Sequence, residues 1–200
     1  VQLLRSIDRQ RVQMDFLVHT GEKASYDDEI RALGSRILPC LAPSQPLRYA
    51  KNFHRIIHEA GPYDIVHSHV HHFSGYVLRL AAQAGIPIRI AHSHSDTSSE
   101  WVNCSAPRRL YLLGTRAVIR RYATDGLAVS TKAASALFGA KWESDSRWRI
   151  LYCGVDLAPF TEKVDGSTIR AELGIPSHAK VVGHVGSFGT PKNHSFIVDV

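Results

Sequence analysis

The stretch that decides the fold runs Tyr63-Asp64-Ile65-Val66-His67-Ser68-His69 and resumes at Gly85-Ile86-Pro87-Ile88-Arg89-Ile90-Ala91-His92-Ser93-His94. Residues 64–67 and 87–91 are short apolar runs of strand length, and residues 74–84 between them have helical spacing. A strand, a helix and a second strand joined by short connections form a βαβ unit, in which the two strands are parallel.

The same alternation extends from this unit in both directions. Strands are predicted at 14–18, 37–39, 126–129 and 148–152, and helices at 26–33, 47–60, 107–122 and 131–138. The helix at 131–138 begins after Ser130, whose hydroxyl suits the first turn as a cap. The pattern therefore predicts an α/β fold, with a Rossmann-like parallel sheet covered by helices.

The pattern changes near residue 153, which divides the chain into parts. We expect an amino-terminal Rossmann-like domain at 1–155, an interdomain linker at 156–178 and the start of a second Rossmann-like domain at 179–200. A strand at 181–185 followed by a glycine-rich loop opens that second domain. Both ends of the chain fall within apolar patterns, so we expect the first domain to lack its first strand and the second to be truncated. The fragment alone is accordingly expected to be inactive.

The composition narrows the class of protein. Apolar residues make up 44% and charged residues 21%, values typical of a folded globular chain, and the net charge is +6. The excess of Lys and Arg suits phosphate-bearing ligands or an anionic surface. Neither a membrane-spanning segment nor a signal peptide is evident, and three widely spaced cysteines indicate free thiols. These features favour a cytoplasmic protein, with peripheral contact to the inner face of the membrane as an option.

Histidine is unusually frequent, with twelve in the chain, and several of them form two close clusters. His67 and His69, like His92 and His94, are two residues apart, so each pair projects from one face if its strand continues. Such pairs can begin a metal site, although the nearby carboxylates lack the spacing of metal motifs. The alternative is a packing or capping role, which is the better interpretation for His71 and His72.

Two further segments could bind a ligand. The loop from Gly186 to Lys192 follows a predicted strand, and its backbone N–H groups with the Lys192 ammonium would attract a diphosphate. An ordinary tight turn is an equally good interpretation. The helix at 107–122 interleaves arginines with leucines, which fits either a solvated face or contact with anionic lipid. No motif for nucleic-acid binding is present.

Taken in order, these segments closely resemble the retaining GT-B glycosyltransferases of family 4, nearest to the bacterial group that makes capsular polysaccharide or exopolysaccharide. Besides the opening stretch, the motifs that carry the resemblance are Leu127-Ala128-Val129-Ser130, Leu151-Tyr152-Cys153-Gly154-Val155-Asp156, Gly183-His184-Val185-Gly186 and Pro191-Lys192-Asn193-His194. The resemblance implies two Rossmann-like domains with the site between them, the first holding the acceptor and the second the nucleotide-sugar.

The resemblance also implies roles for single residues. His92, with His94 as the second choice, is expected near the reacting sugar, and Lys192 is expected to grip the donor diphosphate. The other residues expected to bind substrate are His69, Ser130, Gly186, Ser187 and Asn193. Neither a cofactor nor a metal is expected, because a lysine and helix-start N–H groups can stabilise the leaving diphosphate electrostatically.

The sequence departs from the family pattern at two positions, and alternative functions therefore stay open. Ser187 stands where the family usually has arginine, and Cys153 where it usually has asparagine. The expected activity is transfer of a sugar from a nucleotide-diphosphate sugar to a lipid-linked or glycan acceptor, with retention, in surface polysaccharide synthesis. The alternatives are a metal-dependent hydrolase that uses the His-x-His pairs and a non-catalytic nucleotide-sugar-binding relative.

Overall fold

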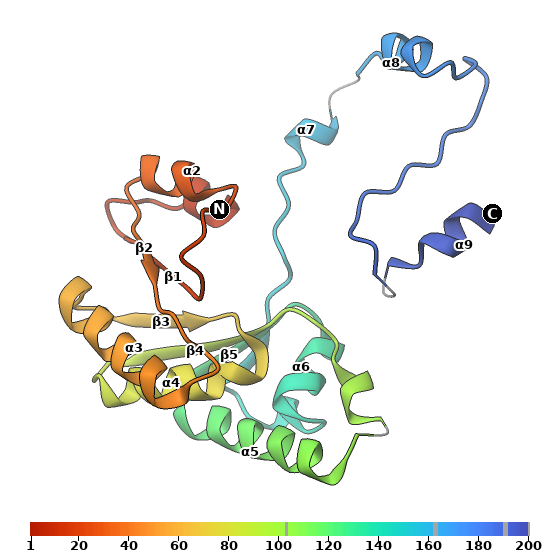
Figure 1. Ribbon diagram of the computed structural model, residues 1–200. Coiled ribbons are helices and arrows are strands. Elements are labelled where there is room, and N and C mark those ends of the chain that lie inside the picture. Colours follow the sequence, from red (N-terminus) through yellow and green to blue (C-terminus); the bar gives the residue numbers. More distant parts are fainter. Residues whose placement is uncertain (103, 162–163, 190–191, 200) are drawn as a thin grey trace. The chain divides into compact units, whose positions relative to one another are not determined.

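The computed structural model describes residues 1–102, 104–161, 164–189 and 192–199. The chain separates into two compact units, Val1–Cys153 and Gly154–Val200 (Figure 1). Each unit is described by itself.

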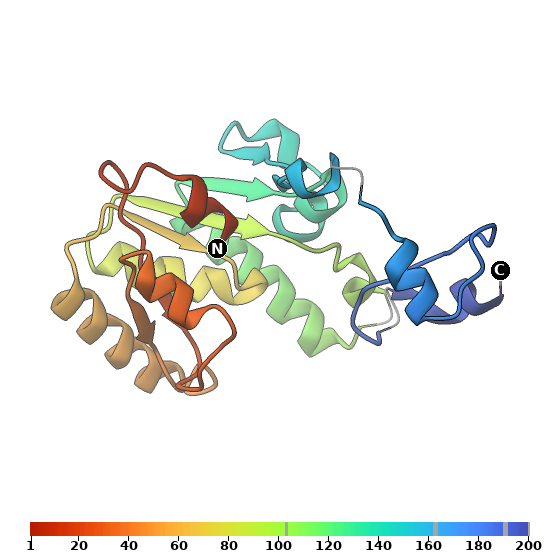
Figure 2. The same ribbon diagram turned by 90° about the horizontal axis from the view of Figure 1, so that it is seen from above.

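A four-stranded parallel sheet forms the centre of the first unit. Its strands are β3 (Ile65–Ser68), β4 (Ile88–Ser93), β5 (Asp125–Ala128) and β6 (Trp148–Ile150), and they lie in that order across the sheet. In the register of β3 against β4, His67 lies opposite Ile90, and in that of β4 against β5, His92 lies opposite Leu127. The arrows point the same way in Figure 2, as the predicted βαβ units require.

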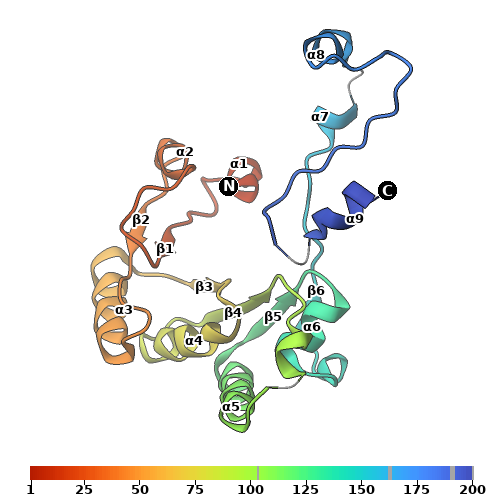
Figure 3. The same ribbon diagram turned by 45° about the vertical axis from the view of Figure 1, so that its right-hand side comes forward.

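Because the strands follow one another in a single direction, their connecting helices lie along the same face of the sheet (Figure 3). These helices are α4 (Ser74–Gln83), α5 (Ala106–Tyr122) and α6 (Thr131–Phe138), and α3 (Pro46–Ala60), which leads into β3, packs beside α4. Among the described residues, the connections also hold the short 3₁₀ segments η1 (His71–Phe73), η2 (Ser98–Trp101) and η3 (Trp142–Ser144). The α/β, Rossmann-like prediction is confirmed for this unit, with strand and helix ends within a few residues of those expected.

The first 60 residues add a separate two-stranded parallel sheet. It consists of β1 (Phe16–Val18) and β2 (Ile37–Pro39), accompanied by α1 (Gln2–Ser6) and α2 (Asp27–Ala32). Asp15 ties this sheet together, because its carboxylate accepts hydrogen bonds from the Arg36 guanidinium at 2.6 Å and from the Tyr63 hydroxyl at 2.7 Å. Within the described ranges, this pair of strands shares no ladder with the four-stranded sheet.

Two apolar clusters hold the helices against the strands. One packs Leu78, Ile119 and Leu137 against Ala91 and Ala128, and the other is built around Tyr49 and Phe53 of α3, with further members Cys40, Ile56, Val77, Leu80, Ala81 and Ile86. Each fully buried leucine or isoleucine contributes about 1.5–3 kcal/mol to the free energy of unfolding. The helix-bearing face of the sheet is therefore fixed, and the histidines project from the other face.

Local signals in the sequence set the helix ends. The Ser130 hydroxyl accepts a hydrogen bond from the Ala133 N–H and caps α6, as predicted, and Ser105 caps α5 in the same way. Gly34 and Gly85 take positive φ angles after α2 and α4. Cys40, Cys104 and Cys153 are all free thiols, which confirms the prediction from their spacing.

The described part of the second unit holds the short helices α7 (Ala158–Thr161), α8 (Ser167–Glu172) and α9 (His194–Asp199). None of these helices buries a residue within the described part of the unit. The predicted strand at 181–185 was wrong, because these residues form no ladder. The physical reason is that a strand needs a partner for its N–H and C=O groups, and none of the described neighbours provides one.

Candidate active site

The histidines of the two His-x-His pairs meet at the carboxyl ends of β3 and β4. His67 lies within β3 and His69 follows it, whereas His92 lies within β4 and His94 follows it. Ser68 and Ser93, which alternate with them, are buried on the helix-bearing side, where the Ser93 hydroxyl donates to the Ala133 carbonyl of α6. The period of two residues therefore turns the four imidazoles to the opposite face.

The four rings, named here the histidine cluster (His67, His69, His92 and His94), are in direct contact. His67 Nε2 lies 3.0 Å from His92 Nδ1, and His69 Nδ1 lies 2.7 Å from His94 Nε2. The rings of His67 and His92 are stacked, with centroids 5.1 Å apart and planes 4° apart. Each of these nitrogen pairs shares one proton, so the hydrogen bonds couple the tautomers of the two partners.

Burial keeps the rings of His67, His69 and His92 neutral at neutral pH. Desolvation lowers the pKa of His67 to about 3 and that of His92 to about 4, and the neighbouring histidines lower both further as like charges. Burial also lowers the pKa of His69, and the like charge of His94 lowers it further. A neutral imidazole can accept a hydrogen bond or coordinate a metal, and it can donate from its second nitrogen.

The other predicted residues of this unit lie close by but play local roles. His71 Nε2 is 3.2 Å from the Thr97 hydroxyl and His72 Nδ1 is 3.3 Å from the Thr115 hydroxyl, which agrees with a packing role for both. Ser130 follows β5 (Asp125–Ala128) at the same edge of the sheet, and its hydroxyl caps α6. Its predicted contact with substrate stays a prediction.

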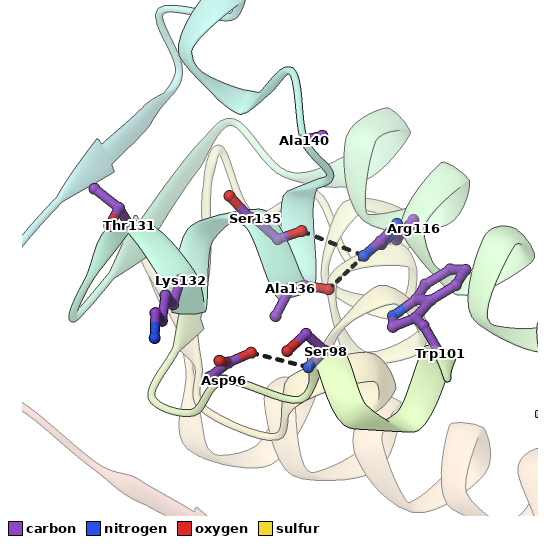
Figure 4. A pocket seen from close by; sticks show the side chains of 9 residues that line it. All are labelled: Asp96, Ser98, Trp101, Arg116, Thr131, Lys132, Ser135, Ala136 and Ala140. Carbon is purple, nitrogen blue, oxygen red and sulfur yellow. Dashed lines mark hydrogen bonds between the residues drawn. The ribbon is translucent and has the colours of Figure 1, made fainter. Parts of the chain in front are cut away.

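A pocket of about 520 Å³ lies between the β4–α5 connection, α5 and α6 (Figure 4). This pocket was not predicted from the sequence. The Arg116 guanidinium lies 3.9 Å from the centre of the Trp101 ring and donates to the carbonyls of Ser135 and Ala136. Burial lowers the pKa of Arg116, and Arg120 lowers it further as a like charge. Lys132 also lines the pocket. Helical spacing alone gives no sign that Arg116, among five arginines of α5, turns inward.

In the second unit, the two described ends of the predicted phosphate loop lie close together. The Lys192 N–H donates to the Gly189 carbonyl, and a Cβ added to Gly186 would lie 3.4 Å from Lys192 Cδ. Asn193 has a φ of 44° and precedes α9. The loop exposes Ser187 as well, while Thr190 and Pro191 lie outside the described residues. Its contact with a diphosphate stays a prediction.

Residues 1–154 match the family described as the glycosyl transferase 4-like domain. The chain belongs to this family. The match covers the whole histidine cluster and the pocket of Figure 4, so both are features of a glycosyl transferase 4-like domain.

Relatives of known sequence or structure support the assignment. The chain is 34% identical over 203 residues to the Bacillus subtilis glycosyltransferase EpsF, covering 99% of this chain and 52% of EpsF. It is 34% identical over 134 residues to a D-inositol 3-phosphate glycosyltransferase of Mycolicibacterium vanbaalenii, covering 64% of this chain and 29% of that protein. HepE of Anabaena, solved with UDP and glucose, shares the fold at a TM-score of 0.56 and 15% identity, over 80% of this chain and 50% of HepE.

The comparisons confirm the expected α/β fold of GT-B glycosyltransferases. The chain spans about half the length of EpsF and HepE. No helix among the described residues combines the length and the apolar character needed to cross a membrane.

Proposed function

We propose that the whole protein is a glycosyltransferase that moves a sugar from a nucleotide-diphosphate sugar to a lipid-linked or glycan acceptor, with retention of anomeric configuration. The observation that carries the proposal is the family match over residues 1–154, which spans the histidine cluster. Two similar proteins support the proposal: EpsF is named as a glycosyltransferase, and HepE was solved with UDP-glucose. The name EpsF also suggests a role in surface polysaccharide synthesis.

His92 is the residue that we assign to the reacting sugar, with His94 as the alternative. Its ring is neutral and buried, so it can orient a sugar hydroxyl by hydrogen bonding without adding a positive charge. That property matters because positive charge develops on the sugar in a retaining transfer, and a cationic imidazole there would oppose it. The cluster holds His92 in one orientation through His67, which is the positioning that such a step requires.

Lys192 and the loop from Gly186 to Asn193 are assigned to the donor diphosphate. The charge of the leaving group grows during transfer, and a lysine ammonium with free backbone N–H groups stabilises it without a metal. Ser187 can add a neutral hydrogen bond where the family usually supplies a second cation. We therefore expect a donor site that depends strongly on Lys192.

The pocket of Figure 4 is the acceptor site in this proposal. Lys132 and Arg116 provide positive charge at its wall, and Trp101 provides an aromatic surface of the kind that sugars and lipids contact. A phosphate of a lipid-linked acceptor fits that combination. Substitution of Lys132 by Gln is expected to raise the KM for the acceptor and leave the KM for the donor unchanged.

Helix α5 is the surface assigned to peripheral membrane contact. Leu110 and Leu113 are 72% and 50% exposed, and Tyr111 lies between them. Arg109 is exposed beside these side chains. Apolar side chains flanked by arginines are the pattern that binds the surface of an anionic bilayer.

The experiment that tests the function uses the whole protein. Purified protein is incubated with UDP-glucose and other nucleotide-sugars in the presence of a lipid-linked acceptor, and the release of UDP and the glycosylated product are measured together. Transfer with retained configuration, read by NMR of the anomeric proton, supports the proposal. Release of free sugar at an equal rate without acceptor favours the hydrolase alternative, and donor binding without turnover favours the non-catalytic alternative.

A further inference from the structure

One nitrogen of the histidine cluster is buried without a partner. His92 is 7% exposed, and its Nδ1 is engaged by His67. Its Nε2 has no hydrogen-bond partner in the part of the chain that the structure describes. A buried polar atom left unpaired costs about 1–3 kcal/mol, so an atom of this kind marks a place where a ligand can bind.

The surrounding nitrogens are spaced for a metal ion. One ring nitrogen from each of His67, His69 and His92 lies within 4.8 Å of the other two. In a tetrahedral zinc site with Zn–N bonds of 2.0–2.1 Å, two ligand nitrogens are about 3.3 Å apart. His92 can offer its unpaired Nε2 to the ion without breaking the 3.0 Å hydrogen bond between its Nδ1 and Nε2 of His67.

We propose that His67, His69 and His92 bind a divalent transition-metal ion and that zinc fits the group best. The described group consists of neutral imidazoles alone, a ligand set that suits zinc and other late transition metals, whereas calcium and magnesium prefer oxygen. Three histidines leave the fourth position of a tetrahedral ion open to water or to an anion.

His94 is a positioning residue in this site. Its Nε2 lies 2.7 Å from Nδ1 of His69, so the two rings share a proton and His94 fixes the tautomer and orientation of His69. A partner of this kind beyond the metal ligands is a regular feature of histidine sites, and its loss weakens metal affinity by 10–100-fold. His94→Gln should therefore weaken binding by about 10–100-fold without abolishing it.

The site has a consequence for catalysis that rests on the proposed function. Zinc bound to His92 occupies the side chain assigned to the reacting sugar, so zinc should inhibit sugar transfer and a chelator should restore it. Binding of zinc itself is independent of that function, because it can be measured without a sugar donor.

The test is a titration of the full chain, freed of metal with EDTA and dialysed, with zinc chloride in a calorimeter and with cobalt(II) chloride in a spectrophotometer. We expect one equivalent of zinc and the intense visible absorption bands of tetrahedral cobalt. His67→Gln, His69→Gln and His92→Gln should each weaken binding by more than the 10–100-fold expected for His94→Gln. His58→Gln, an exposed histidine of α3, is the matched control and should bind as the parent does.

The fold of each variant is checked by circular dichroism and by its unfolding temperature without metal. A variant that unfolds is replaced by the corresponding Asn or Ala variant, so that each ligand position is read in a folded chain. The proposal is overturned if the parent binds no stoichiometric zinc. It is also overturned if the His67 or His92 variant still binds zinc as the parent does while the His58 control does not. A protein that binds zinc but transfers no sugar overturns the proposed function and leaves the metal site standing.

Discussion

Acidification should destabilise the first unit through the histidine cluster. The pKa of His92 is about 4 in the folded chain, against about 6.5 for a histidine in an unfolded chain. Between these two values the unfolded chain binds more protons than the folded one, so the free energy of unfolding falls as the pH is lowered from 7 to 5. The stability is fully present above about pH 6.5 and is lost toward pH 4.

The magnitude follows from the burial of each ring. At pH 5, 1.5 pH units below the ordinary value, the stability that the buried His92 contributes falls by about 2 kcal/mol. His67, whose pKa is about 3, is half-buried, and allowing for solvent screening by a factor of two it adds about 1 kcal/mol. The total of about 3 kcal/mol is a large part of the 5–15 kcal/mol typical of a folded domain.

The assay is urea unfolding at pH 7 and pH 5 in the presence of EDTA, followed by tryptophan fluorescence, which reports the buried Trp142 and Trp148 of the first unit. The pH range lies above the titration of the carboxylates, whose resolved pKa shifts, such as that of Asp15, are downward. The double variant His67→Gln, His92→Gln should lose about 3 kcal/mol of the pH dependence. His58→Gln should retain all of it. An equal pH dependence in parent and double variant would refute the reasoning.

Three further predictions follow from single sites. Gly126→Ala should destabilise the chain by about 3 kcal/mol or more in urea unfolding, because the new Cβ would lie 2.2 Å from the Trp148 ring, whereas Gly114→Ala in α5, with open space around it, should stabilise the chain by up to about 1 kcal/mol. Equal effects of the two substitutions would contradict the packing. Lys192→Ala should weaken UDP-glucose binding by about 10–100-fold, or 1.5–3 kcal/mol, in calorimetry and leave uridine binding unchanged; an equal loss for both ligands would make the loop purely structural. Leu110→Gln should lower sedimentation with anionic vesicles, whereas Leu47→Gln, at an even more exposed site on α3, should not; if both variants sediment as the parent does, α5 makes no membrane contact.

The regular parts of the fold were predictable because their signals are local. Apolar spacing placed α3 and α5 to within one residue, and the cap at Ser130 placed the start of α6. The two His-x-His pairs could be expected at one edge because strand alternation and parallel pairing bring them there. The position of both pairs at this edge confirms that prediction from strand periodicity and parallel pairing.

The parts that failed depend on contacts distant in the sequence. The run at 181–185 has the composition of a strand, but strand formation requires a partner, which is not a property of the run itself. The inward turn of Arg116 depends on Trp101 and on the carbonyls that end α6, which no spacing on α5 reveals. The direct contact of His67 with His92 likewise depends on the diagonal offset between β3 and β4.

The most direct test of the central claim is the rate of sugar transfer by the whole protein and by its His92→Gln variant, measured with saturating UDP-glucose and a lipid-linked acceptor. The account predicts transfer by the parent, a fall in kcat of about 100-fold or more in the variant and a nearly unchanged Kd for UDP-glucose. His58→Gln should transfer at the rate of the parent. A His92→Gln variant with the full rate of the parent, in a folded protein, would contradict the assignment of the histidine cluster to the reacting sugar.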